Sequence, residues 1–223
     1  MVIRWWRRGV RAGFRLLYNE LAWTYDGVSW LVSLGEWRAW QAAGLAFLPA
    51  SSPTPPRILE LAHGPGHMLV ALRRVGFAPV GVDLSPFMGR LARQRLRRAG
   101  LPSPLIRASA LALPFADHSF DHILATFPTD FITQREASTQ LWRLLRPGGR
   151  LVIVPQAQFR GRGVLVRLLA CLYAITGQRL AVTSAAVSPW LALEAAGFRV
   201  REEHVSLPRS VVLVVVAEKF PYN

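Results

Sequence analysis

Short apolar runs alternate with amphipathic stretches from Arg57 to about residue 155. The runs have the length and the bounding turns of buried strands, and the stretches between them carry apolar residues at helical spacing. We expect strands at 57–62, 79–84, 105–109, 120–127 and 150–155, and helices at 66–75, 86–99 and 133–145. Because strand and helix take turns over such distances, the pattern predicts βαβ units and a parallel sheet with helices on both faces.

The order of elements changes after residue 155. An apolar helix near 163–176 and a second helix near 188–196 precede two final apolar runs, at 198–207 and 210–219. So few residues separate these runs that we expect them to pair as an antiparallel hairpin at one side of the sheet. The prediction is therefore an α/β fold with a mostly parallel, seven-stranded sheet and an antiparallel C-terminal hairpin.

The first 48 residues differ from the rest of the chain. They hold six of the eight tryptophans and a cluster of arginines, Arg4, Arg7, Arg8, Arg11 and Arg15. Two or three short helices with basic and aromatic faces are expected there. The proline-rich stretch 49–56 suits neither a helix nor a central strand. It is therefore interpreted as a connector between residues 1–48, an N-terminal helical lid or membrane-proximal extension, and a main domain of residues 57–223.

Charge is the unusual feature of the composition. The chain has 27 basic and 13 acidic residues, a net charge of +14, and Lys219 is its single lysine. Such a surface favours polyanions, which include nucleic acid, anionic lipid headgroups and phosphorylated substrates. The base composition of the genome or a hot habitat would give the same arginine content without any partner. The mean hydropathy of +0.25 favours a membrane surface over nucleic acid.

No segment of the sequence is expected to span a bilayer. The most apolar stretch, 164–176, has about 13 residues and contains Arg167, whereas a spanning helix needs roughly 20. The start of the chain lacks the apolar region and cleavage site of a secretory signal. The single cysteine, Cys171, excludes a disulfide framework within the chain. We expect a cytoplasmic protein and leave open whether it contacts the inner face of the membrane.

The strongest chemical signal is the segment 58–67. It places a strand, an acid and a turn of small residues directly before a helix: Glu60, Ala62, Gly64 and Gly66. Such a turn lets backbone approach a ligand, and the helix N-terminus offers free N–H groups to the ligand's polar part. Asp83 ends the second strand, where a carboxylate accepts hydrogen bonds from ribose hydroxyls. Turn and acid in one βαβ frame indicate a cofactor that contains adenosine.

Four successive segments resemble the motifs of class I S-adenosylmethionine-dependent methyltransferases. They are ILELAHGPGH, VGVDLSP, ASALALPFADHSFDHI and LLRPGGRLVIV. The ALPF, SFD and RPGG elements are similar to the branch that contains ubiquinone and menaquinone biosynthesis methyltransferases. The resemblance covers residues 57–155, and it implies a Rossmann-like fold, S-adenosylmethionine as cofactor and methyl transfer by in-line displacement.

The resemblance also implies roles for the residues of the cofactor turn. Glu60 would position the turn and the methionine amino end of the cofactor, and Gly64 and Gly66 would let the cofactor lie against the backbone. Asp83 would take the ribose. Ala62 stands where the family has its first glycine, so this turn carries an extra methyl group.

The adenine and the acceptor are assigned in the same way. Leu84 would flank the adenine, and Ala110 would lie beside its ring. Ser109 occupies the place where this branch usually has an aspartate that accepts a bond from the adenine amino group; a neutral serine should contribute less. Thr126, counted with the cofactor residues, and Phe127 fall where this class faces its substrate.

A general base is needed only if the acceptor has a proton to lose. Its candidates are Tyr25 and Asp26, whose WTYD context resembles a pair that closes over the cofactor in this branch, and Asp130 and His67. His63 also flanks the cofactor turn, but a loop histidine is more often simply solvated. His118 and His122 do not stand at a metal-ligand spacing with cysteine or carboxylate, so we predict no metal.

The acceptor is the open question. The apolar helix near 163–176 either packs in the core or covers an apolar ligand. Together with the basic, tryptophan-rich N-terminus it favours a hydrophobic or lipid-like acceptor taken at a membrane surface. An RNA or protein methyltransferase that uses the arginine-rich surface is the alternative, although FPTD at 127–130 replaces the NPPY-type tetrapeptide. A catalytically idle scaffold is disfavoured by the intact cofactor motif.

Overall fold

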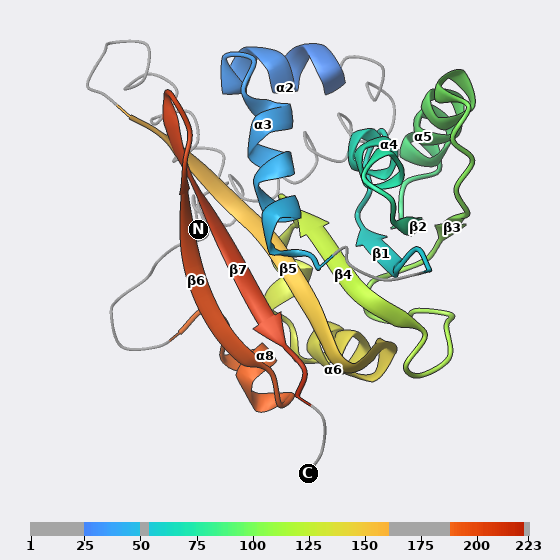
Figure 1. Cartoon of the computed structure of the whole chain (residues 1–223), viewed down its shortest axis with the longest axis vertical. Coiled ribbons are helices and arrows are strands. Elements are labelled where there is room, and N and C mark those ends of the chain that lie inside the picture. The colour runs from blue at the N-terminus through green and yellow to red at the C-terminus, as the bar shows by residue number, and fades with distance from the viewer. Residues whose placement is uncertain (1–24, 50–53, 161–187, 221–223) are drawn as a thin grey trace, which may run out of the picture.

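A computed structural model of the protein describes residues 25–49, 54–160 and 188–220, and Figure 1 shows their arrangement around one sheet. The seven strands lie in the order β3-β2-β1-β4-β5-β7-β6. They are β1 (Arg57–Leu61), β2 (Ala78–Asp83), β3 (Leu105–Arg107), β4 (Phe120–Thr126), β5 (Leu145–Phe159), β6 (Arg199–Ser206) and β7 (Ser210–Glu218). The first five strands run parallel, and β7 is antiparallel to both β5 and β6. The predicted parallel sheet with an antiparallel hairpin is confirmed.

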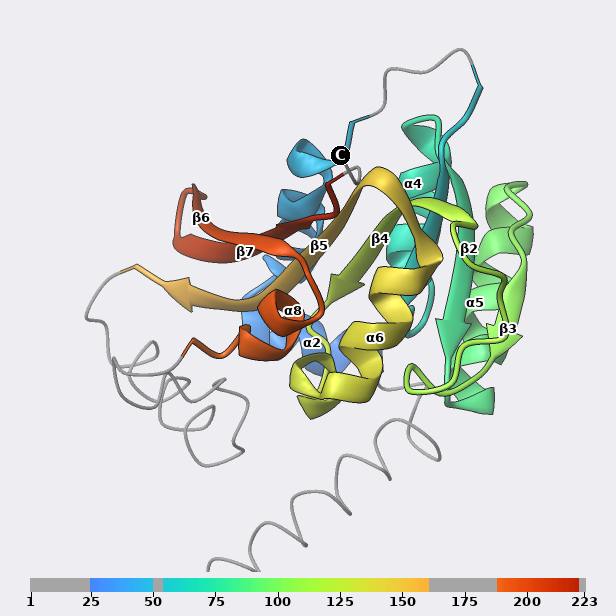
Figure 2. The same ribbon diagram turned by 90° about the horizontal axis from the view of Figure 1, so that it is seen from below.

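Helices cover both faces of the sheet, as Figure 2 shows in the view from below. The described helices are α2 (Tyr25–Ser33), α3 (Trp37–Ala42), η2 (Ala43–Phe47), α4 (His67–Arg74), α5 (Pro86–Ala99), η3 (Asp130–Thr133), α6 (Arg135–Leu144) and α8 (Leu191–Ala195). One core cluster joins α3, η2 and α4 to one face, and it includes Trp40 and Met68. The other joins α6 and α8 to the opposite face through Leu141 and Leu193. None of the described helices is long and apolar enough to cross a bilayer.

Burial explains the character of the central and edge strands. Strand β4 is buried at five consecutive positions from His122 to Thr126, because parallel strands are covered by helices on both faces. Strand β6, at the edge, shows no fully buried position and carries Arg199, Arg201, Glu202 and Glu203. Charged side chains on an edge strand discourage pairing with another chain.

Helix α5 begins and ends where its local sequence dictates. Ser85 accepts a hydrogen bond from Met88 N through Oγ at 3.3 Å, and Pro86 supplies the first helical residue. Gly100 ends the helix with a left-handed φ of 65°. These caps fix the orientation of the segment that follows the end of β2.

Strand β5 differs from the sequence prediction. The expected strand at 150–155 followed a turn, but the strand begins at Leu145, which pairs with Phe120. The register then shifts, and regular pairing resumes between His122 and Arg150. Gly148, with a φ of 80°, allows the backbone of β5 to bulge, and β5 pairs with β4 on both sides of the bulge. The expected helix near 163–176, Cys171 and the arginine cluster of residues 1–24 lie outside the described residues.

Helix α3 is anchored to the C-terminal hairpin. Trp40 donates through Nε1 to Ser210 Oγ at 2.8 Å, and Ser210 donates to Glu36 Oε2 at 2.5 Å. Arg209 forms an ion pair with Glu36 at 3.1 Å. Burial raises the pKa of Glu36, but hydrogen bonds from Ser210, Arg209 and Trp40 outweigh it, so the pKa is lowered and the carboxylate stays charged. Residues 36–48 are therefore firmly part of the folded core.

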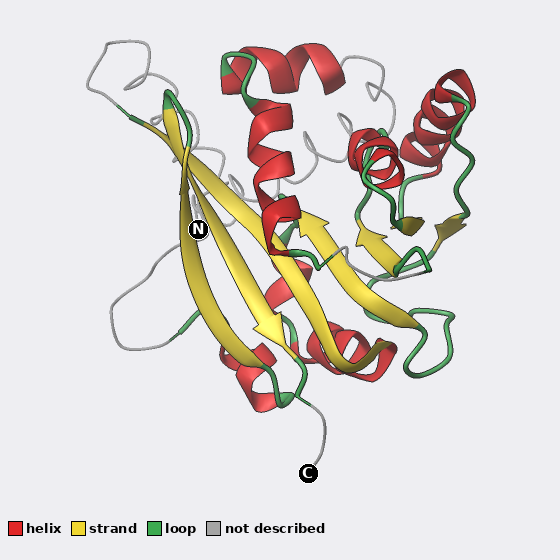
Figure 3. Cartoon of the chain, viewed as in Figure 1, coloured by secondary structure: helices red, strands yellow, loops and turns green. Residues whose placement is uncertain are grey.

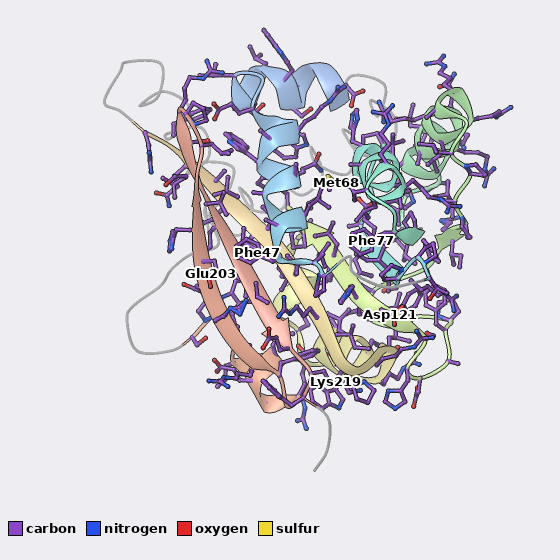
Figure 4. The ribbon with its side chains drawn as sticks, viewed as in Figure 1. Phe47, Met68, Phe77, Asp121, Glu203 and Lys219 are labelled. Atoms are coloured by element: carbon purple, nitrogen blue, oxygen red, sulfur yellow. The ribbon has the colours of Figure 1, made fainter. Side chains whose placement is uncertain are left out.

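Lys219 lies at the end of the sheet where the parallel strands begin, and Figure 4 labels it near α6. Its side chain is buried, and Nζ donates to Trp142 O at 2.7 Å and to Leu145 O at 2.9 Å. The ammonium also lies 4.7 Å from the centroid of the Trp142 ring. These carbonyls belong to the last turn of α6, where a cation satisfies unpaired acceptors and the helix dipole together.

We expect Lys219→Met to lower the free energy of unfolding by about 2 to 3 kcal/mol, because charged hydrogen bonds to buried carbonyls are lost. Chemical denaturation followed by circular dichroism measures the change. Arg201→Met, which removes an exposed cation from β6, is the matched control and should cost less than about 1 kcal/mol. Equal effects of the two substitutions would contradict the role given to Lys219.

Candidate cofactor and acceptor site

The turn between β1 and α4 lies at the carboxyl end of the parallel strands. Figure 3 shows the arrowheads of β1 and β4 directed toward the end of the molecule that carries α2. Ala62, Gly64 and Gly66 all have left-handed backbone, with φ values of 53°, 52° and 82°. Helix α4 begins at His67 without a side-chain cap. No side chain of the described residues therefore caps the first backbone N–H groups of α4.

The two glycines of the turn are needed for different reasons. A Cβ on Gly66 would lie 2.8 Å from Ala92 Cβ, so only glycine lets α4 approach α5. A Cβ on Gly64 would meet nothing within 4 Å. Gly64 therefore faces open space. Ala62 adopts a φ that costs an alanine roughly 1 kcal/mol, which shows that the turn tolerates the extra methyl group under strain.

Asp83 ties the turn to the end of β2. Its Oδ2 accepts a hydrogen bond from Gly64 N at 2.9 Å, and its Oδ1 accepts one from Ser85 N at 2.8 Å. The next residue, Leu84, is 66% exposed. The structure thus brings the turn and the acid together as expected, with an apolar side chain beside them.

Glu60 is a buried carboxyl group with an oxygen that no hydrogen-bond donor in the described part of the chain satisfies. It is 1% exposed, and its Oε2 has no hydrogen-bond partner among the described residues. Burial raises the pKa of Glu60 well above its usual value, and the nearby Asp83 adds to the rise. A buried carboxyl group with a free acceptor is a ready partner for a cation. This free acceptor and the open space at Gly64 fit the amino end and the backbone-facing side of S-adenosylmethionine.

A second set of residues meets at the end of β4. Gln41 of α3 donates through Nε2 to Thr126 Oγ1 at 3.0 Å, and Gln41 Oε1 has no partner among the described side chains. Phe127 follows with a left-handed φ of 49°, and its ring stacks on Trp37 with centroids 4.3 Å apart. Left-handed backbone at a bulky residue is strained, and such strain concentrates at functional sites.

Asp26 and His67 are bonded to each other. His67 Nε2 lies 2.8 Å from Asp26 Oδ1, and Arg95 Nη2 lies 2.5 Å from Asp26 Oδ2. The hydrogen bond from His67 is the largest cause that lowers the pKa of Asp26, and Arg95 adds to it. A carboxylate with a lowered pKa that is held by a histidine and an arginine is a weak base. The contact instead fastens α2 to the start of α4. The side chain of Tyr25 lies outside the described residues.

His63 is buried beneath the turn. It is 4% exposed, and its Nδ1 lies 2.7 Å from Gly64 O. Burial lowers the pKa of His63 despite the opposing effect of Asp83, so the ring is neutral at pH 7. His63 also packs against Gly81 of β2, where any Cβ would lie 2.9 Å from the imidazole. These contacts give His63 a supporting position under the backbone of the turn.

The remaining predicted residues make local contacts of their own. Ser109 Oγ accepts a bond from Leu111 N at 3.2 Å, and Ala110 is half-buried beside it. Asp130 is exposed at the start of η3. His118 Nδ1 lies 3.0 Å from Leu145 O, and His122 Nε2 lies 3.2 Å from Pro49 O. In the described ranges no three His, Cys, Asp or Glu residues form a group suited to a metal ion.

Sequence reasoning missed Gln41, Trp37 and Arg95. Arg95 was hidden because α5 carries many arginines, and nothing in the sequence distinguishes the one that reaches Asp26. Gln41 and Trp37 stand four residues apart on the face of α3 that also carries Trp40. An amide within an otherwise apolar helix face was the available signal.

Comparison with known proteins shows what the chain is similar to. Residues 58–149 match the family model described as a methyltransferase domain. The demethylmenaquinone methyltransferase of Thermus thermophilus is 36% identical over 141 residues, which cover 62% of this chain and 63% of the relative. The ubiquinone/menaquinone biosynthesis C-methyltransferase of Roseobacter denitrificans is 31% identical, over 64% of this chain and 58% of the relative. The chain thus spans about 60% of the length of these relatives.

Solved structures with the same fold include methyltransferases. Phosphoethanolamine N-methyltransferase 2 of Haemonchus contortus, bound to phosphomonomethylethanolamine and S-adenosylhomocysteine, aligns with a TM-score of 0.61 at 17% identity, over 84% of this chain and 53% of that one. The YcgJ protein of Bacillus subtilis aligns with a TM-score of 0.60 at 17% identity, over 81% of this chain and 99% of that one. At this identity the likeness establishes the Rossmann-like fold.

The resemblance carried by the four sequence motifs is confirmed by the family match and by the curated relatives. Residues 58–149 match a methyltransferase domain, and over about 62–64% of its length the chain is similar to enzymes named for demethylmenaquinone methylation and for ubiquinone/menaquinone biosynthesis.

Proposed function

We propose that the protein transfers the methyl group of S-adenosylmethionine to a small, hydrophobic, quinone-like acceptor. The observation that carries this proposal is the free carboxyl oxygen of Glu60 beside the open, glycine-containing turn that Asp83 holds in place. The curated relatives are named for the methylation of demethylmenaquinone and for C-methylation in quinone biosynthesis. Their names support an aromatic, apolar acceptor for this chain.

Each residue of the turn would bind one part of the cofactor. Asp83 would accept hydrogen bonds from the ribose hydroxyls with the lone pairs that Gly64 N and Ser85 N leave free. Glu60 would balance the methionine ammonium, and Gly64 and Gly66 would let backbone approach. At the rim, Leu84 would flank the adenine beside Ser109 and Ala110.

The cofactor supplies a methyl group on a positively charged sulfur, and the chain's own task is to align the acceptor with it and to exclude water. Alignment alone accounts for much of the rate in a displacement of this kind. Asp26 and His67 are engaged with each other and with Arg95. We therefore assign them to the closure of α2 over the turn rather than to proton removal.

Transfer of labelled methyl groups to a lipid extract and to RNA, tested side by side, is the direct experiment. Methylation of RNA has its own support, because Arg90, Arg93, Arg97 and Arg98 are exposed on α5. Label in a hydrophobic, lipid-extractable product supports the proposal. Label in RNA alone would overturn the acceptor class, and the absence of S-adenosylmethionine binding would overturn the activity.

We expect Asp83→Ala to weaken S-adenosylmethionine binding by about 1 to 3 kcal/mol, because a charged hydrogen-bond acceptor is lost. Isothermal titration calorimetry measures the affinity. Asp83→Asn, which keeps one acceptor oxygen for Gly64 N, separates the ribose contact from collapse of the turn. Asp117→Ala removes an exposed carboxylate paired with Arg143 and is the control. Unchanged affinity in Asp83→Ala would remove the ribose assignment.

Glu60→Gln is expected to stabilise the free protein at neutral pH while it weakens cofactor binding. The pKa of Glu60 is raised in the folded state, so above the ordinary value of 4.5 the unfolded chain releases a proton that the folded chain retains. The free energy of unfolding therefore falls as pH rises above that value, by about 1.4 kcal/mol for each unit of the shift. Glutamine removes this loss.

The comparison of wild type and Glu60→Gln is made by denaturant unfolding between pH 5 and pH 8. The stability advantage of the variant should grow across this range. Calorimetry in two buffers of different ionisation enthalpy should also show proton release when S-adenosylmethionine binds to the wild type, and none with the variant. A variant that is less stable at pH 8 and binds the cofactor normally would contradict the role of Glu60.

The proposed acceptor would be met at an anionic membrane surface through α2. Three apolar side chains of this helix, Val28, Trp30 and Leu31, are exposed, the last two by 65% and 62%. Tryptophan and leucine on a helix face suit the interface between headgroups and acyl chains. In Figure 1, α2 lies at the end of the molecule where the cofactor turn also lies. A lipid-like acceptor would thus enter beside the site.

We expect the full chain to bind vesicles that contain phosphatidylglycerol, and Trp30→Ser with Leu31→Ser to weaken this binding about tenfold, since two apolar side chains lose their insertion. Co-sedimentation measures the bound fraction. Added salt should weaken the wild-type binding without abolishing it. Leu191→Ser, on the exposed surface of α8, is the control. Truncation near Pro49 would also remove Trp40, which is buried in the core. Substitutions within α2 are therefore the better test of its membrane contact. Equal binding by the double variant would assign the contact elsewhere.

A further inference from the structure

Gln41 presents an unmatched polar group in a buried place. The residue is 9% exposed, and Thr126, to which it donates through Nε2 at 3.0 Å, is 6% exposed. Gln41 Oε1 is buried and has no partner among the described residues. A buried acceptor without a partner destabilises a fold, and native proteins satisfy nearly all such groups. A buried amide oxygen without a partner is therefore expected at a place where a bound ligand supplies the missing hydrogen bond.

The position of this amide is at the reacting edge of the sheet. Thr126 is the last residue of β4. In the parallel pairing of β1 with β4, Leu61 lies opposite Ala125, so the next residues, Ala62 of the cofactor turn and Thr126, lie at the same level. On its other side, Phe127 stacks on Trp37 and lies 6.1 Å from the Trp40 ring. The amide thus stands between the turn that would hold the cofactor and a half-buried aromatic wall.

The chemistry of the amide selects its ligand. With Nε2 on Thr126, the free end of Gln41 accepts a hydrogen bond; with the amide turned over, the free end donates one. A hydroxyl group both donates and accepts, so it satisfies either arrangement. The ammonium of the cofactor only donates, and its charge is better matched by the carboxyl group of Glu60 than by a neutral amide.

We propose that Gln41, held by Thr126, binds a hydroxyl group on the aromatic ring of the acceptor. The inference rests on the proposed methyl transfer and assigns to Gln41 the discrimination between rings with and without a hydroxyl group. Trp37 and Phe127 contact the ring, and Gln41 selects rings that carry the hydroxyl. Thr126 is a positioning residue, because it fixes the amide while the amide meets the acceptor.

The experiment compares two probes of the same ring size, 1-naphthol and naphthalene, on the full chain with S-adenosylhomocysteine present. Competition against a fluorescent ligand measures both affinities. The wild type should bind 1-naphthol about fivefold more tightly, as expected for one neutral hydrogen bond. Gln41→Met keeps the length of the side chain, and it should lose this preference while it keeps its affinity for naphthalene. Thr126→Val should lose part of the preference.

Gln94→Met, on the exposed surface of α5, is the matched control and should preserve the preference. S-Adenosylmethionine affinity is measured for every variant, and Gln41→Met should leave it unchanged. If Gln41→Met keeps the preference for 1-naphthol, or if the wild type has none, the inference is wrong. If Gln41→Met instead loses cofactor affinity, the amide serves the cofactor. A wild type that binds no S-adenosylmethionine would overturn the proposed function separately.

Discussion

The hydrogen bond from Gly64 N to Asp83 Oδ2 holds together the edge of the sheet on which the proposed chemistry depends. It joins the turn after β1 to the end of β2, so two strands that are neighbours in the sheet also share one loop structure. With Ser85 N on its other oxygen, Asp83 sets the start of α5 as well. The left-handed turn and the N-terminus of α4 are thereby fixed before any ligand arrives, which reduces the ordering cost of binding.

Buried polar groups of two kinds lie at the ends of the parallel strands, one charge-compensated and the other without partners among the described residues. At the amino end, the ammonium of Lys219 meets two carbonyls and an aromatic ring, so its charge is compensated. At the carboxyl end, Glu60 Oε2 and Gln41 Oε1 are left without partners. Unmatched groups cost stability, and two of them beside the cofactor turn are typical of a binding site, where ligand contacts take the place of internal ones.

Much of the fold was predictable because local chemistry and burial agree. The caps Ser85 and Gly100 bound α5 at the predicted residues, and the continuous apolar run of β4 marks a strand buried on both faces. The limits of β5 were not predictable, because its first pairing, Leu145 with Phe120, depends on a bulge at Gly148 that only the neighbouring strand reveals. Local propensity does not contain such a cross-strand contact.

In the candidate site, too, contacts within a sequence motif were predictable and contacts between distant segments were not. Glu60, Gly64, Gly66 and Asp83 are close in sequence and follow a motif, so their meeting was predictable. The approach of Gln41 to Thr126 spans 85 positions, and the contact of Asp26 with Arg95 spans 69. Both depend on how the N-terminal helices pack, which a sequence pattern of single elements does not describe.

The N-terminal helices are held from two directions. Asp26 fastens α2 to the start of α4, and Glu36 with Trp40 fastens α3 to the hairpin through Ser210. The residues proposed to meet the acceptor, Trp37 and Gln41, stand between these two attachments. The first attachment is half-exposed, and exposed ion pairs are weak; the second is buried and hydrogen-bonded. Opening of the site would therefore start at α2, while α3 keeps the aromatic wall and the amide of Gln41 in position.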